Sequence, residues 1–134
     1  MSHLNEDTLR RGYAAFAQGD LSGFLSICTD DVTFTVPGSS PASGVYTKAT
    51  FVPWITRIIS LTEGTFREEV LDVFANDDHG VLLLRHSFDR DGKFREYRTA
   101  HICRMRDGKI SQWIEHPGSL DEFEAAWSVD YRRA

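Results

Sequence analysis

The stretch from residue 81 to residue 116 constrains the fold most, because one turn motif occurs in it twice. Residues 90–93 and 106–109 both read Arg-Asp-Gly-Lys, and each motif separates two strand-like runs of residues. An Asp-Gly pair between two such runs is typical of a β-hairpin. The sequence therefore predicts three consecutive antiparallel strands joined by two tight turns.

The length of each turn decides which residues face each other. Each motif fits a two-residue Asp-Gly turn, or a three-residue Arg-Asp-Gly loop in which a left-handed glycine forms a bulge. The two alternatives give opposite registers, and we favour the three-residue loops. They imply these cross-strand pairs: Asp89 with Lys93, Arg85 with Tyr97, Val81 with His101, Met105 with Lys109, His101 with Trp113, and Thr99 with Glu115.

The favoured register sorts the side chains onto two faces, because successive residues of a strand point to opposite sides. One face is expected to carry Val81, Leu83, Arg85, Ser87, Tyr97, Thr99, His101, Cys103, Trp113 and Glu115. The other is expected to carry Leu82, Leu84, His86, Phe88, Arg98, Ala100, Ile102, Ile110 and Ile114. Both faces are largely apolar, so we expect helices on the first and a second copy of the chain on the second, giving a homodimer. The alternative cover for the outer face is the C-terminal segment or a long loop.

Composition limits the class of protein. A chain of 134 residues, 41% hydrophobic and 12% aromatic, is expected to form a single domain over residues 1–134. The net charge of −5 argues against nucleic acid as a partner, because no face collects the Lys and Arg side chains that neutralise phosphates. A small hydrophobic molecule is the partner that we expect.

The cysteines and the N-terminus bear on location. Cys28 and Cys103 are isolated and lack Cys-x-x-Cys spacing, so we interpret them as reduced core residues of an intracellular protein, with a disulfide as the second alternative. The first residues hold acids and no apolar core of a signal peptide, and no apolar run approaches the length of a membrane span. The sequence predicts a cytoplasmic protein without membrane contact.

Helix and strand signals precede the hairpins. Asn5 or Asp7 is expected to cap a first helix, and Asp20 a second helix whose apolar stripe runs from Leu21 to Cys28. Residues 32–36 alternate as a strand, residues 48–61 follow helical spacing despite Pro53, residues 66–74 form another strand, and residues 120–127 a closing helix. Helices on one face of a mainly antiparallel sheet make an α+β fold.

Several short segments carry a family resemblance. They are residues 29–34 (Thr-Asp-Asp-Val-Thr-Phe), 43–46 (Ser-Gly-Val-Tyr), 71–76 (Leu-Asp-Val-Phe-Ala-Asn), and 104–110 (Arg-Met-Arg-Asp-Gly-Lys-Ile) ahead of 115–118 (Glu-His-Pro-Gly). In this order and spacing they make the chain resemble the SnoaL-like branch of the nuclear transport factor 2-like superfamily, which contains ketosteroid isomerases, limonene epoxide hydrolases and polyketide cyclases.

The resemblance implies a fold and a kind of site. The fold is a cone-shaped, cystatin-like α+β barrel, in which a curved antiparallel sheet wraps around three N-terminal helices and a short C-terminal helix follows. Members are usually dimeric, have a hydrophobic pocket, and use no metal ion or organic cofactor. Their chemistry varies, so the pocket residues have to indicate the function.

Matching the known enzymes position by position leaves gaps. The ketosteroid isomerase base falls on Val36, which cannot move a proton, and the isomerase's hydrogen-bond donor to the enolate falls on His101. Limonene epoxide hydrolases have an Arg-x-Asp where this chain has Arg85 and Ser87, while their second acid matches Glu115. The acidic base of the polyketide cyclases is not assigned between Glu115 and Asp121.

The candidate catalytic residues are Glu115, His101 and Arg85, which share a face in the favoured register. We interpret Glu115 as a general base, His101 as an acid or as a hydrogen-bond donor to a carbonyl oxygen, and Arg85 as a group that tunes Glu115 or binds a substrate anion. The alternative is a structural Arg85–Glu115 ion pair beside a core histidine. The expected ligand-binding residues are Tyr13, Phe16, Val36, Tyr46, Trp54, Ser87, Tyr97, Thr99, Trp113 and His116.

Other polar and aromatic residues are assigned as follows. His86 is expected on the outer face, and the adjacent acids Glu68 and Glu69 at the solvated surface. The histidines show neither His-x-His nor His-x-x-x-His spacing, so no metal site is predicted. Seven aromatic residues are candidates for a flat-sided pocket, with an ordinary core as the alternative: Tyr13, Phe16, Phe34, Trp54, Trp113, Phe123 and Trp127.

Three functions are compatible with the sequence. The leading hypothesis is a cofactor-independent enzyme that performs proton-transfer chemistry, such as isomerisation, cyclisation or hydration, on a hydrophobic cyclic carbonyl compound. The second is a non-catalytic domain that binds a hydrophobic ligand, and the third is a protein-interaction module, which should have a filled core.

Overall fold

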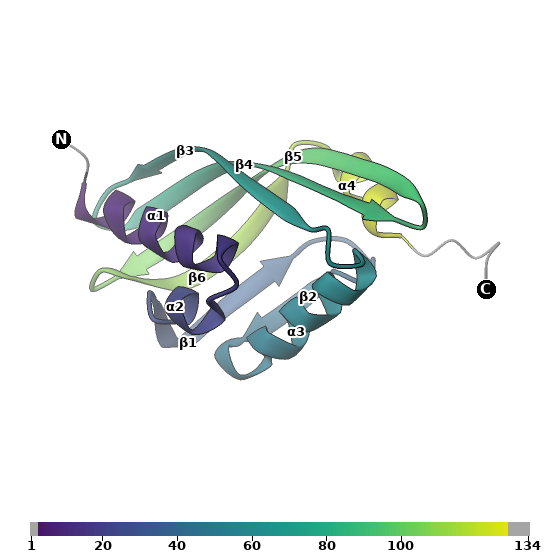
Figure 1. The fold of residues 1–134 in the computed structure, drawn as a ribbon. Coiled ribbons are helices and arrows are strands. Elements are labelled where there is room, and N and C mark those ends of the chain that lie inside the picture. The colour runs from purple at the N-terminus through teal and green to yellow at the C-terminus, as the bar shows by residue number, and fades with distance from the viewer. Residues whose placement is uncertain (1–2, 129–134) are drawn as a thin grey trace.

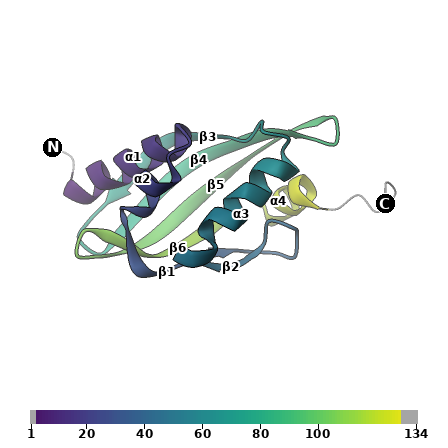
Figure 2. The same cartoon turned by 60° about the horizontal axis from the view of Figure 1, so that its bottom comes forward.

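The structure is a computed structural model and describes residues 3–128. These residues form four helices and six strands: α1 (Leu4–Ala17), α2 (Leu21–Leu25), β1 (Cys28–Val36), β2 (Gly44–Thr47), α3 (Lys48–Leu61), β3 (Arg67–Ala75), β4 (His79–Arg90), β5 (Lys93–Arg106), β6 (Lys109–Pro117) and α4 (Leu120–Trp127). Helices α1, α2 and α3 lie on the concave face of a strongly curved sheet, and α4 lies at one end (Figure 1, Figure 2). This α+β plan is the predicted one.

Local sequence signals explain the helix starts. The imidazole of His3, rather than Asn5 or Asp7, caps α1 by accepting a hydrogen bond from the Asn5 backbone N–H, and Glu6 completes a capping box. The Asp20 carboxylate caps α2 as predicted. This second helix ends at Leu25, so Cys28 belongs to β1 and not to the helical stripe that the sequence suggested.

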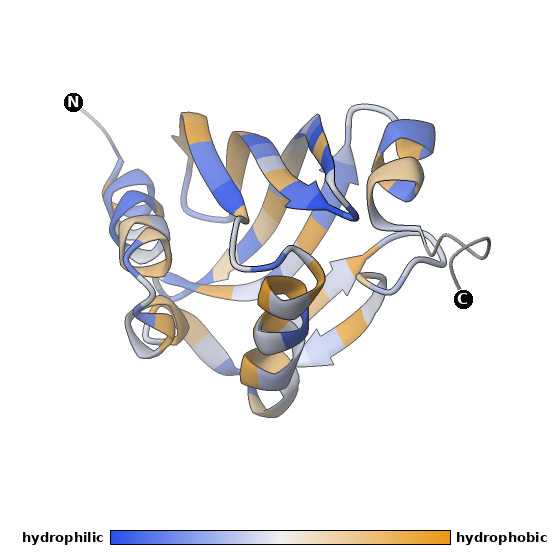
Figure 3. Ribbon diagram, turned by 45° about the vertical axis from the view of Figure 1, so that its right-hand side comes forward, coloured by the Kyte–Doolittle hydropathy of each residue, from blue (hydrophilic) through white to orange (hydrophobic). Residues whose placement is uncertain are grey.

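The sheet has the strand order β2-β1-β6-β5-β4-β3 and is not closed into a barrel. Its pairs are antiparallel except that β1 runs parallel to β6. The short edge strand β2 was not predicted from the sequence. Hydrophobic and hydrophilic residues alternate along several of the strands, so each strand has an inner and an outer side (Figure 3).

Both hairpin turns are two-residue turns, so the prediction of three-residue loops was wrong. Asp91 and Gly92 have φ values of 53° and 75°, and Asp107 and Gly108 have φ values of 52° and 78°. Two successive left-handed residues make a type I′ turn, whose twist matches the right-handed twist of the strands. In the first hairpin the consequence is a register one residue away from the expected one, with Arg85 opposite Arg98.

A β-bulge in the second hairpin restores the predicted faces there. Met105 pairs with Ile110 but Arg104 pairs with Gln112, which leaves Ser111 as the extra residue. Beyond the bulge His101 therefore lies opposite Glu115. Because the bulge shifts the pairing once more, His101, Trp113 and Glu115 share the inner face as expected, whereas Ile110 moves from the expected outer face into the core.

The core lies between the helices and the inner sheet face. Phe34, Phe51, Phe88 and Phe123 are among its largest fully buried side chains. Cys28 and Cys103 are free and buried in it, as predicted. None of the helices formed by the described residues is long and apolar enough to cross a membrane.

Candidate functional site

A cavity of about 60 Å³ lies between the helices and the concave sheet face. Its walls include all seven aromatic residues proposed from the sequence: Tyr13, Phe16, Phe34, Trp54, Trp113, Phe123 and Trp127. The volume is well below the roughly 300 Å³ at which pockets for drug-sized ligands begin. In this conformation the cavity therefore has room for a small molecule only.

Four ionisable side chains meet in the cavity wall, one from each of four adjacent strands. They are Glu68 of β3, His86 of β4, His101 of β5 and Glu115 of β6. Glu68 lies directly opposite His86, and His101 lies directly opposite Glu115, so the sheet register places two acid–imidazole pairs side by side. The side chains of His86, His101 and Glu115 are at most 6% exposed, and that of Glu68 is 10% exposed.

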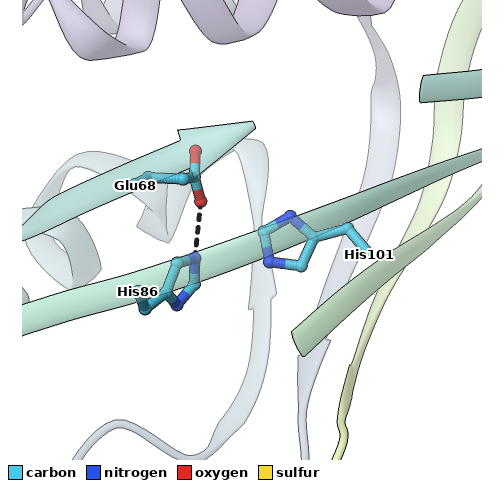
Figure 4. A group of neighbouring side chains, drawn as sticks. All are labelled: Glu68, His86 and His101. Atoms are coloured by element: carbon cyan, nitrogen blue, oxygen red, sulfur yellow. Dashed lines mark hydrogen bonds and ion pairs between the residues drawn. The ribbon is translucent and has the colours of Figure 1, made fainter. Parts of the chain in front are cut away.

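The two pairs are also in contact with each other. The Nε2 atom of His86 lies 2.8 Å from Oε2 of Glu68 (Figure 4). Oε2 of Glu115 lies 3.6 Å from Nδ1 of His86 and 3.6 Å from Nε2 of His101. The Thr99 hydroxyl donates a 2.9 Å hydrogen bond to the same oxygen. Glu115 is thus the carboxylate on which both imidazoles converge.

These contacts shift the protonation of Glu115 and His86. Burial alone would raise the pKa of Glu115, but the nearby His101 imidazole, the charge of His86 and the hydrogen bond from Thr99 together lower it below 4.5. Burial alone would lower the pKa of His86, but its hydrogen bond to Glu68 and the charges of Glu115 and Glu68 raise it above 6.5. Glu115 is therefore an ionised carboxylate at neutral pH.

Each imidazole contacts a tyrosine hydroxyl, which in turn accepts a hydrogen bond from a tryptophan indole. The Tyr13 hydroxyl lies 2.6 Å from Nδ1 of His101 and accepts a 2.9 Å hydrogen bond from the Trp113 indole. The Tyr97 hydroxyl lies 3.0 Å from Nδ1 of His86 and accepts a 2.8 Å hydrogen bond from the indole of Trp127. Burial raises the pKa of both tyrosines well above 10, so both remain neutral phenols.

The structure assembles most of the residues predicted for the site. Glu115 and His101 share the inner face, and the ligand-binding candidates Tyr13, Phe16, Val36, Trp54, Tyr97 and Trp113 line the cavity. Two further candidates do not line the cavity but contact residues that do. Tyr46 stacks on Trp54 with ring centroids 4.5 Å apart, and the Thr99 hydroxyl donates a hydrogen bond to Glu115.

Three predicted residues are not in the site. Arg85 points to the outer face, where its guanidinium lies 3.4 Å from the exposed carboxylate of Glu69, so it neither tunes nor pairs with Glu115. Ser87 lies on the same outer side of β4, because it is two residues from Arg85. His116 is exposed, because it follows Glu115 directly and points the other way.

Sequence reasoning missed Glu68 and His86 as members of the site. His86 was placed on the outer face because the turn length was wrong, and correcting the register moves it inside. Glu68 was interpreted as one of two solvated acids, yet alternation sends only Glu69 to solvent and brings Glu68 to the cavity wall. The signal that would have found His86 is the two-residue Asp-Gly turn, whereas the place of Glu68 follows from the pairing of β3 with β4.

The same side chains include a donor set of the kind that binds metal ions. One ligand atom from each of Glu68, His86 and His101 lies within 4.8 Å of the others. Two histidines and one carboxylate suit a divalent transition-metal ion. The expectation that no metal site exists rested on short sequence spacings, which do not bear on a group assembled from three strands.

Comparison with known proteins identifies the family. The model of the SnoaL-like domain matches residues 9–113 of the chain. The chain belongs to the SnoaL-like domain family. Its fold matches that of a nuclear transport factor 2-like protein from Burkholderia pseudomallei with a TM-score of 0.83, at 19% identity and covering 95% of this chain and 99% of that one.

Two further relatives extend the comparison. The SnoaL-like chain is 29% identical to the uncharacterised protein Rv0034 of Mycobacterium tuberculosis over 124 residues, which cover 91% of this chain and 95% of that protein. It superposes on Bal32a, from a soil-derived mobile gene cassette, with a TM-score of 0.86 and 26% identity, covering 92% of this chain and 96% of that one. Neither name indicates a reaction.

Proposed function

We propose that this SnoaL-like protein is a small enzyme that transfers a proton on a carbonyl compound held in the cavity. The observation that carries the proposal is the pair of buried Glu–His contacts in a wall that is otherwise made of aromatic and aliphatic side chains. Burying ionisable groups costs free energy that an apolar core would not incur. Such groups with shifted pKa values in a cavity are concentrated at functional sites.

Each side chain has a role that follows from its contacts. Glu115 is ionised and in reach of the cavity, so it is the general base. His101 faces the same space and acts on the carbonyl oxygen, as an acid or as a hydrogen-bond donor. His86 and Glu68 form a second pair, in which Glu68 stabilises the positive charge of His86 beside Glu115. Arg85, which lies on the outer face, has no part in the reaction.

The walls suggest the kind of substrate. Aromatic rings surround the acid and the imidazoles, so a flat apolar ring compound fits their chemistry. The small volume favours a monocyclic ketone over a steroid-sized molecule unless wall side chains move. Isomerisation, cyclisation and hydration all need only the base and the donor that this chain supplies.

A non-catalytic ligand-binding protein is the second candidate. Val36 lines the cavity where ketosteroid isomerases have their base, and Ser87, where limonene epoxide hydrolases have an acid, lies outside it. The interaction-module hypothesis is weaker, because it requires a filled core and this core contains a cavity with buried charges.

The test is a thermal-shift screen of cyclic ketones, steroids, terpenoid epoxides and polyketide-like aromatic acids, followed by an assay for turnover of each hit. An enzyme should keep the ligand-induced shift in Glu115→Gln but lose about 100-fold or more in turnover. Glu69→Gln is the matched control, because it makes the same change at an exposed acid on the outer face. This variant should turn over the substrate normally. Binding without turnover in the wild type would establish the second candidate instead.

We also propose that the protein is a homodimer through the outer sheet face. One continuous row of directly paired residues crosses all six strands on this face: Phe74, Val81, Ile102, Ile114, Thr35 and Val45. Val45 is 67% exposed and Phe74 is 51% exposed in the single chain. Apolar side chains in such a row are usually covered by a partner, and a second copy offers the same surface.

A cytoplasmic location is part of the proposal. Both cysteines are free and buried, although a cavity-containing domain of this size would gain stability from a disulfide. Free thiols are usual in the reducing cytoplasm.

A further inference from the structure

We infer that His101 is held as a neutral imidazole with its proton on Nε2, and that the cavity therefore binds the oxygen of a carbonyl, enol or phenol through this N–H rather than a metal ion. The catalytic consequence rests on the proposed function, whereas the protonation pattern and the ligand class do not.

The hydrogen bonds of Tyr13 fix the position of the proton on His101. Its oxygen accepts a hydrogen bond from the indole N–H of Trp113, because an indole nitrogen can only donate. The phenol keeps its own proton, and among the described residues the one recorded acceptor for it is Nδ1 of His101, 2.6 Å away. Tyr13 is therefore the donor to His101, and Nδ1 carries a lone pair.

A neutral imidazole with a lone pair on Nδ1 has its proton on Nε2. Within residues 3–128 this Nε2 atom is buried and lacks a hydrogen-bond partner. It lies 3.6 Å from Oε2 of Glu115, beyond hydrogen-bond distance, in the wall of the cavity. A buried donor without a partner is uncommon in folded proteins, so a ligand atom is the natural acceptor.

The matching contacts of His86 lead to a different outcome. The indole of Trp127 donates to the Tyr97 hydroxyl, which lies against Nδ1 of His86, just as the indole of Trp113 donates to the Tyr13 hydroxyl beside His101. Here, however, Nε2 is already within 2.8 Å of Glu68, so its proton has an acceptor inside the protein (Figure 4). Of these two imidazoles, His101 alone presents an unused donor.

The position of Glu115 narrows the ligand class. A ligand oxygen that accepts a hydrogen bond from His101 lies next to a carboxylate that accepts but does not donate. An enol or phenol oxygen satisfies both neighbours, because it accepts from Nε2–H and donates its own proton to Glu115. A ketone oxygen satisfies the first neighbour and reaches the enol state once a proton has moved.

A metal ion requires the opposite proton arrangement. Coordination by Nε2 of His101 would need its lone pair, which moves the imidazole proton to Nδ1. The Tyr13 hydroxyl would then receive two donors, from His101 and Trp113, and its own proton would lose the acceptor that the structure gives it. Glu68, His86 and His101 are residue types that suit a metal ion. The hydrogen bonds of Trp113 and Tyr13 nevertheless favour an oxygen ligand over a cation at this place.

The test is ¹⁵N NMR of the histidine rings in labelled wild-type protein at neutral pH, with His101→Gln used to assign the His101 signals. We expect protonated Nε2 and unprotonated Nδ1 in His101. Tyr13→Phe should convert His101 to a mixture of tautomers and leave His86 unchanged. The matched control, Tyr97→Phe, should leave the His101 tautomer unchanged. A proton on Nδ1 of His101 in the wild type would overturn the inference.

Two probes then test the ligand class. Phenol should shift the His101 Nε2–H resonance, and its affinity should fall about fivefold in Tyr13→Phe, as expected for one mispositioned hydrogen bond. Stoichiometric Zn²⁺ should leave that resonance in place, and its loss on adding Zn²⁺ would overturn the inference in favour of a metal site. If the tautomer and phenol binding are as expected but no ketone is turned over, the inference stands and the proposed enzyme function fails.

Discussion

Nε2 of His86 lies 2.8 Å from Oε2 of Glu68, so two adjacent strands place an imidazole and a carboxylate directly opposite each other inside the cavity. Burial by itself lowers the pKa of His86, but this contact and the charge of Glu115 together raise it, while the neighbouring Glu115 has a lowered pKa. Two buried groups with shifts of opposite sign make the stability of the fold depend on pH in a defined way.

The first prediction is a stability maximum between about pH 4.5 and pH 6.5, the ordinary pKa values of the two groups. His86 binds its proton more tightly in the folded state, so its contribution is complete below pH 6.5 and is lost as the pH rises through the raised pKa. Glu115 releases its proton more readily when folded, so its contribution is complete above pH 4.5 and is lost as the pH falls through the lowered pKa.

Thermal unfolding followed from pH 3 to pH 9 would measure both limbs. Glu68→Gln should flatten the alkaline limb and Glu115→Gln the acidic one, since each removes the interaction responsible. An alkaline limb that is unchanged in Glu68→Gln would show that the Glu68–His86 contact does not raise the pKa of His86.

The second prediction separates two residues that are adjacent in the chain. Arg85→Ala should change the free energy of unfolding by less than about 1 kcal/mol and leave ligand-induced thermal shifts intact, because its ion pair with Glu69 is exposed. His86→Ala should cost about 1–3 kcal/mol and weaken ligand binding, because it leaves Glu68 without its buried partner. Urea denaturation and thermal shift measure the two effects. Equal effects of the two substitutions would contradict the register found for β4.

The sequence prediction placed Arg85 on the inner face and His86 on the outer face, the reverse of the structure, for a physical reason. Residues 81–88 read Val-Leu-Leu-Leu-Arg-His-Ser-Phe, with apolar side chains on both faces, so alternation does not choose which face is inside. The turn length had to decide, and an Asp-Gly pair is compatible with both lengths. For β5 and β6 the bulge at Ser111 compensated for the wrong turn, which is why His101 and Glu115 were correctly placed together.

Other features depend on contacts that no local pattern contains. The helices, the hairpin strands and the aromatic cavity wall follow from spacing and composition. The parallel pairing of β1 with β6 joins segments far apart in the sequence. The site members Glu68 and His86 come from separate strands, and their partners Tyr97 and Trp127 become recognisable as such once the register is known.

The third prediction concerns the bulge. Deleting Ser111 would place Gln112 directly after Ile110, so the Arg104–Gln112 pair would follow the Met105–Ile110 pair without an extra residue, and Trp113 and Glu115 would stay on the inner face. The deletion variant should therefore unfold cooperatively and keep its ligand-induced thermal shift, as Ser111→Ala should. Circular dichroism and thermal melting would measure this. A deletion variant that loses cooperative unfolding would show that the bulge itself, and not only the pairing on either side of it, is needed for the fold.

The fourth prediction tests the dimer. Ile102 lies in the middle of the apolar row on the outer face and is 36% exposed in the single chain, so Ile102→Glu would bury a charge at the proposed interface. Leu120→Glu, on α4 away from that face, adds the same charge at a residue that is 51% exposed and should have no effect. Light scattering after gel filtration should give twice the chain mass for the wild type and Leu120→Glu, and the mass of one chain for Ile102→Glu. Because Ile102 points away from the cavity, the monomeric variant should still bind its ligand, and a wild-type protein with the mass of one chain would rule out the interface.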